Sequence, residues 1–110
     1  MKLFRYTIVG ACALLLMAAN KPAYALQVFT GRVTGIELTY MPSSIRFTLD
    51  TGNAACPAGT TLTWQNANAE NNKVVYSALT TALASRQKIV FYINDGDVTC
   101  VGRFIYLAPA

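Results

Sequence analysis

The feature that most constrains the fold is a long run of alternating apolar and polar residues, residues 27–40, that changes phase partway along. The apolar positions are Phe29 and Val33 in the first phase and Ile36, Leu38 and Tyr40 in the second. Successive side chains of a β-strand point to opposite faces, so a phase change requires an inserted residue, a β-bulge. Gly31 or Gly35 is the natural position for it. Long first strands that bend in this way are typical of small closed barrels.

Four further strand-like segments follow. Strands are predicted over residues 45–49, 60–65, 88–94 and 98–107, with a turn over 41–44, loops over 50–59 and 66–72, and a tight hairpin turn over 94–97. The alternation puts Ile45, Phe47 and Leu49 on the inward face of the second strand. In the third strand, Leu62 and Trp64 share one face.

One helix is predicted over residues 73–85, with Asn71 or Asn72 as its N-cap. Its apolar face consists of Val75, Leu79, Ala82 and Leu83. The order β-β-β-α-β-β predicts a mainly β fold with one helix, an OB-fold-like five-stranded Greek-key barrel. The alternative is an α+β sandwich, with the helix on one face of an open sheet.

Residues 1–25 have the pattern of a secretory signal peptide. Lys2 and Arg5 precede an apolar run over residues 6–19, and Ala23-Tyr24-Ala25 is a small-x-small cleavage pattern. The apolar run is shorter than the roughly 20 residues that span a bilayer, which argues against a membrane anchor. We therefore predict a single domain over residues 26–110, exported by a Sec-type signal to the periplasm or beyond, with no membrane span in the mature chain.

The charge balance changes once the leader is removed. The whole chain has a formal net charge of +4, but three of its nine basic residues, Lys2, Arg5 and Lys21, lie in the leader. The six that remain face five acidic residues and are scattered along the chain. Nucleic-acid binding needs a basic stripe that neutralises phosphates, so nucleic acid is not an expected partner.

The mature chain has two cysteines, Cys56 and Cys100, whereas Cys12 belongs to the leader. An even pair in an exported domain predicts one disulfide between Cys56 and Cys100, with free thiols as the alternative. The two residues do not form a C-x-x-C pair, which argues against a redox function.

The sequence contains no histidine, the commonest general base and metal ligand. Asp95 and Asp97 flank Gly96, which is ordinary turn chemistry, and a calcium site would need six to eight oxygen ligands. We therefore predict no catalytic residues, no metal site and no cofactor, and interpret the protein as a non-enzyme.

Aromatic residues are the remaining candidates for binding. Most of them fall on the apolar phase of a strand, where core packing is expected. Tyr92 is the exception, since it is opposite in phase to Phe91 and Ile93. Trp64 fits either a core position or an anchor at the rim of a site.

Three segments resemble a known family: Phe-Thr-Gly-Arg-Val at 29–33, Val-Tyr-Ser-Ala-Leu at 75–79 and Gln-Lys-Ile-Val-Phe-Tyr at 87–92. They look like the receptor-binding B subunits of AB-type bacterial toxins, of the subtilase-cytotoxin and pertussis-like kind. That resemblance implies an OB-fold, ring pentamers and sialoglycan binding. It matches Thr30 to the hydroxyl position that holds the carboxylate of the sugar, and it puts Tyr92 next to the position of a binding tyrosine. The family's extra N-terminal segment and loop-cysteine spacing are not reproduced.

The chain also looks like small exported proteins of proteobacteria that share this fold without a toxin role. The sequence thus predicts a small exported binding module that holds a glycan near Thr30 and Tyr92. The alternative is a periplasmic or secreted protein with a structural or protein-interaction role. A homo-oligomer, and a pentamer in particular, follows only from the toxin-like interpretation.

Overall fold

The computed structural model describes residues 25–110, and the predicted leader, with Cys12, lies outside them except for its last residue. The elements are β1 (Leu26–Glu37), β2 (Ile45–Leu49), β3 (Leu62–Trp64), α2 (Ala69–Ser85), β4 (Lys88–Asn94) and β5 (Gly102–Ala108). This is the predicted order of elements. No helix within the described residues has the length and hydropathy that crossing a membrane requires.

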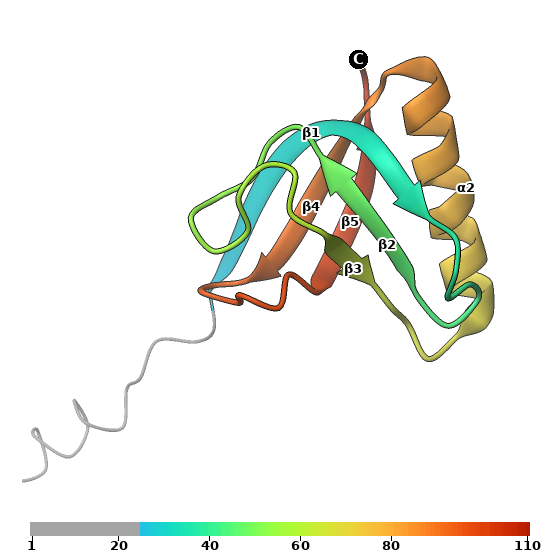
Figure 1. Cartoon of the computed structure of the whole chain (residues 1–110), viewed down its shortest axis with the longest axis horizontal. Helices are drawn as coiled ribbons and strands as arrows, with labels where there is room; N and C mark the ends of the chain where they lie inside the picture. Colours follow the sequence, from blue (N-terminus) through green and yellow to red (C-terminus); the bar gives the residue numbers. More distant parts are fainter. Residues whose placement is uncertain (1–24) are drawn as a thin grey trace, which may run out of the picture.

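The five strands form one antiparallel sheet in the order β3-β2-β1-β4-β5. The sheet is curled into a half-barrel, and α2 lies along one side of it (Figure 1). The two edges of the sheet approach each other at a parallel bridge between Thr63 and Val101. Next to this bridge, the Thr63 N–H donates to the Cys100 carbonyl at 3.0 Å. The predicted mainly β fold with one helix is confirmed.

The long first strand joins the two halves of the sheet. β1 pairs with β4 from Leu26 to Arg32 and with β2 from Val33 to Glu37. The register shifts between Val33 and Gly35, which leaves Thr34 without a partner in the pairing with β2, so the predicted bulge is present and lies directly beside the second of the two glycines. Because of this bulge, one strand can follow the curvature of the half-barrel.

The prediction for the far end of this strand is wrong. β1 ends at Glu37, and Leu38 and Tyr40, which were expected to face inward, are exposed. The chain turns over residues 39–43, and the Tyr40 ring instead lies 4.5 Å from the guanidinium of Arg46. The turn removes these residues from the alternation, so their apolar character does not lead to burial.

The core lies on the concave side of the sheet, against α2. Phe91 is completely buried and packs against Phe29 and Phe47, with ring centroids 5.7 and 5.2 Å away. The inward residues predicted on the second strand, Ile45, Phe47 and Leu49, are all buried. The other buried apolar residues are Val33, Cys56, Leu62, Trp64, Val75, Leu79, Ala82, Ile89, Ile93 and Cys100.

The helix begins one turn earlier than predicted. Its N-cap is Asn68, whose side chain accepts a hydrogen bond from the Glu70 N–H at 2.9 Å, so neither Asn71 nor Asn72 is the cap. Of the predicted apolar face, only Leu83 is exposed. At 100° per residue, it lies about 80° around the helix from Val75, at the margin of the buried face.

The Cys56–Cys100 disulfide is confirmed and joins the loop after β2 to the segment before β5. The third strand is shorter than predicted, and the fifth begins at Gly102 rather than Val98. A turn is present over residues 94–97, where the Asp97 N–H donates to the Asn94 carbonyl at 3.0 Å. It does not lead directly into a strand, because the Asp97 carboxylate accepts hydrogen bonds from the N–H groups of Thr99 and Val101 and holds a second turn.

Candidate functional site

The two residues predicted to bind a ligand, Thr30 and Tyr92, lie on neighbouring strands and on the same face of the sheet. In the register of β1 and β4, Val28 is opposite Tyr92 and Thr30 is opposite Val90. Thr30 and Tyr92 are therefore diagonal neighbours, a relation that separates residues by about 7–8 Å. Phe29 and Phe91, the adjacent residues in sequence, point into the core, so Thr30 and Tyr92 point outward.

β5 extends this face with two aromatic residues. Phe104 is opposite Tyr92, and Tyr106 is opposite Val90. The Tyr92 ring makes edge-to-face contacts with both, at centroid distances of 6.1 and 5.6 Å. We call this surface the outer aromatic face; it consists of Val28, Thr30, Val90, Tyr92, Phe104 and Tyr106. Three of its side chains are about half exposed: Val28 (54%), Phe104 (47%) and Tyr106 (54%).

The backbone at Thr30 is held in place by the loop that follows β2. The Thr51 hydroxyl donates to the Thr30 carbonyl at 2.7 Å, and the Arg32 N–H donates to the Asp50 carboxylate at 2.8 Å. The loop comes so close that a Cβ on Gly31 would lie 2.7 Å from the Asp50 carboxylate. The Thr30 side chain is exposed, and its hydroxyl makes no hydrogen bond to any residue in 25–110. This hydroxyl is therefore available to a ligand.

Trp64 is a core residue. It is 8% exposed, and its indole N–H donates to the side-chain oxygen of Asn71 at 3.0 Å. A tryptophan whose N–H has a partner suits such a buried position, and the small part of Trp64 that stays exposed lines a hollow between α2 and β5. Of the two positions that the sequence left open for Trp64, the structure shows the core.

A separate hollow lies over β1 and β2, away from both predicted residues. Its volume is about 360 Å³, and Glu37, Arg46, Thr48 and Thr61 contribute its polar side chains. The Thr48 hydroxyl is hydrogen-bonded to that of Thr34 at 2.7 Å. None of these four residues is among the binding residues that the sequence predicts.

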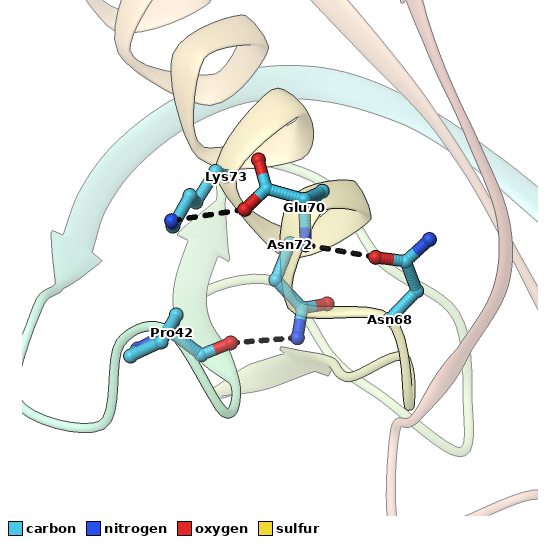
Figure 2. Close-up of polar contacts among 5 residues, drawn as sticks. All are labelled: Pro42, Asn68, Glu70, Asn72 and Lys73. Carbon is cyan, nitrogen blue, oxygen red and sulfur yellow. Dashed lines mark hydrogen bonds and ion pairs between the residues drawn. The ribbon is translucent and has the colours of Figure 1, made fainter.

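Asn72 is the one fully buried polar residue among residues 25–110. Its amide nitrogen donates to the carbonyls of Pro42 (2.7 Å), Ser43 (3.1 Å) and Asn66 (3.0 Å). Its oxygen accepts from the Asn66 N–H at 2.9 Å. Figure 2 shows the bond to Pro42 beside the Asn68 cap and the Lys73–Glu70 ion pair. Every polar group of this amide is satisfied within the fold, so Asn72 has a structural role.

The Asp97 carboxylate, in the loop before β5, is also structural. The Thr99 hydroxyl and N–H donate to the Asp97 carboxylate, and these bonds hold the pKa of Asp97 below its usual value. Within the described part of the chain, no three histidine, cysteine or acidic side chains form a group that could hold a metal ion.

Comparison with protein-family models, curated proteins and solved structures finds no match to this chain. The function is therefore inferred from the sequence and structure of this chain. Phe104 and Tyr106, which complete the outer aromatic face, were expected in the core. The signal that could have identified them is their phase: they alternate with Ile105, which packs against the core.

Proposed function

We propose that residues 26–110 form an exported, non-catalytic binding module that holds carbohydrate on the outer aromatic face. The observation that carries this proposal is the exposure of Tyr106 and Phe104 beside Tyr92, one register step from the free hydroxyl of Thr30. Sugar rings stack their C–H faces on aromatic rings, and their hydroxyls exchange hydrogen bonds with threonine and tyrosine. The outer aromatic face provides both kinds of contact.

We also propose that the five strands have the topology of an OB-fold. An OB-fold-like Greek-key barrel is supported by the parallel bridge from Thr63 to Val101, which connects the two edges of the curled sheet. OB-folds are known to hold oligonucleotides and oligosaccharides on their surfaces. Export of this domain rests on the pattern of residues 1–25, and a non-catalytic function rests on the residue types of the sequence.

A glycan array with the purified mature protein tests the ligand class. We expect binding to a sialylated or neutral glycan, and at least a 10-fold loss for Thr30→Val, which keeps the shape of the side chain but removes its hydroxyl. Thr61→Val is the matched control, because Thr61 is an exposed threonine in the separate hollow. Loss of binding in the control alone would move the site to that hollow, and an array without any bound glycan would end the carbohydrate assignment.

A protein-interaction role is the second candidate, and Val28 and Phe104 favour it, since they expose apolar surface without a polar group. Sizing by light scattering distinguishes the two interpretations. A discrete pentamer would support a toxin-B-like assembly, and a monomer would favour the interaction protein.

A further inference from the structure

β5 is an edge strand whose outer side is open beyond the bridge between Thr63 and Val101, which lies just before the strand. Within residues 25–110 it pairs along its length with β4, and no backbone hydrogen bond joins residues 103–108 to any other segment. In an antiparallel pair, every second residue of an edge strand turns its N–H and C=O away from its neighbour. The outer side of β5 therefore offers a row of donors and acceptors to another strand.

An apolar groove runs along this open edge, with α2 as its opposite wall. Its volume is about 310 Å³; β5 lines it with residues 104–107, and α2 lines it with Val74 and Ala78. Val74 is 68% exposed, and together with the exposed Phe104, Tyr106 and Leu107 it gives the groove an apolar surface. We call this feature the β5–α2 groove. None of the side chains that line it carries a charge at neutral pH.

One positively charged side chain lies at the start of the part of β5 that lines the groove, residues 104–107. Arg103 directly precedes this segment and is exposed. The one ion pair within residues 25–110 joins Lys73 to Glu70, so no described carboxylate neutralises Arg103. A partner that carries apolar side chains and one carboxylate would complement both the groove and this guanidinium.

We propose that the β5–α2 groove binds an extended peptide segment of another protein, which adds to β5 as a further strand. The open edge supplies main-chain hydrogen bonds, as in other cases of strand addition. Apolar side chains at alternate positions of the peptide enter the groove, and an acidic residue pairs with Arg103. The proposal is independent of carbohydrate binding, although Phe104 and Tyr106 border both surfaces.

The test is a selection of random dodecapeptides displayed on phage against the purified protein, followed by anisotropy titrations of the enriched peptides. We expect them to alternate apolar with polar residues and to contain an acidic residue. Val74→Glu should weaken binding at least 10-fold, and Arg103→Ala several-fold. Val98→Glu is the matched control, because Val98 is a valine of similar exposure, 75% against 68%, outside the groove, and it should leave binding unchanged.

Two further measurements distinguish strand addition from non-specific apolar adhesion and from misfolding of the variants. Peptides that are N-methylated at alternate backbone positions should bind at least 10-fold more weakly, because they cannot pair with β5. Val74→Thr, which introduces no charge, should give an intermediate loss, with thermal melting confirming that both Val74 variants are folded. Three results would overturn the proposal: no enriched peptide, enriched peptides that bind Val74→Glu as well as wild type, or a wild-type self-association that Val74→Glu abolishes, which would assign the groove to a second copy.

Discussion

At the residue scale, the amide of Asn72 connects the first turn of α2 to two loops through the groups of Pro42, Ser43 and Asn66. Removing a buried hydrogen-bonding group leaves its partners unsatisfied, at about 1–3 kcal/mol each where water cannot replace it. We expect Asn72→Ala to lower the free energy of unfolding by about 2–4 kcal/mol, measured by urea denaturation.

Asn68→Ala is the control for this prediction, since it removes only the N-cap bond to Glu70. It should cost about 1 kcal/mol. If the two variants were equally stable, the Asn72 amide would not be what connects α2 to the two loops.

A second prediction at this scale concerns pH. Hydrogen bonds from Thr99 lower the pKa of Asp97 in the folded protein, so its carboxylate stabilises the fold at pH values above its unfolded pKa of about 4. This contribution disappears as the pH falls through the lowered pKa. Asp97→Ala should therefore melt about 2–5 °C below wild type at pH 7, and the difference should shrink at pH 3 and below.

Asp95→Ala is the matched control for the pH series, because Asp95 is the neighbouring acidic residue and its carboxylate accepts no hydrogen bond from residues 25–110. Its melting temperature should follow that of wild type across the series. A constant difference between Asp97→Ala and wild type from pH 7 to pH 2 would show that the carboxylate charge is not responsible.

At the scale of elements, the disulfide fixes the start of β5. It closes a loop with a sequence separation of 44, which in the chain-entropy model stabilises the fold by about 4 kcal/mol. Replacing both Cys56 and Cys100 by alanine should lower the melting temperature by at least 10 °C, measured by circular dichroism. Mass spectrometry of the unreduced protein should show two hydrogens fewer than the free thiols, and an unchanged melting temperature would contradict the structural role.

Two strands have the bounds that the sequence predicts. β2 is indicated by its alternation of apolar and polar residues and β4 by a nearly continuous apolar run, and in both strands every second residue is buried. The bulge in β1 was also predictable, because a change of phase in a strand requires an inserted residue. Local pattern is sufficient in these cases because the inner face of the sheet is fully covered.

The errors at the start of the helix and at the start of the fifth strand come from polar side chains that have several possible hydrogen-bond partners. Residues 66–72 contain four asparagines that could each cap a helix, and only the three-dimensional contacts assign Asn68 to the cap and Asn72 to the core. Asp97 similarly folds back on Thr99 and delays the start of β5. The choice at Asn72 depends on partners far along the chain, such as Pro42, which local pattern does not include.

At the scale of the whole molecule, the curled sheet brings distant parts of the sequence into one surface. Thr30, Tyr92 and Tyr106 come from three strands, and only the strand order β1-β4-β5 makes them neighbours. The sequence alone identified Thr30 and Tyr92, because the phase of Tyr92 and the family resemblance pointed to them. It missed Phe104 and Tyr106, because apolar residues in a strand were assigned to the core.

The most direct test of carbohydrate binding by the outer aromatic face is a glycan-array measurement on wild type and Tyr106→Ala. Tyr40→Ala is the control, because Tyr40 has similar exposure, 46% against 54%, and lies outside this face. We predict that Tyr106→Ala lowers the affinity for the bound glycans at least 10-fold, whereas Tyr40→Ala binds like wild type. Equal binding by wild type and both variants would contradict carbohydrate binding at this face.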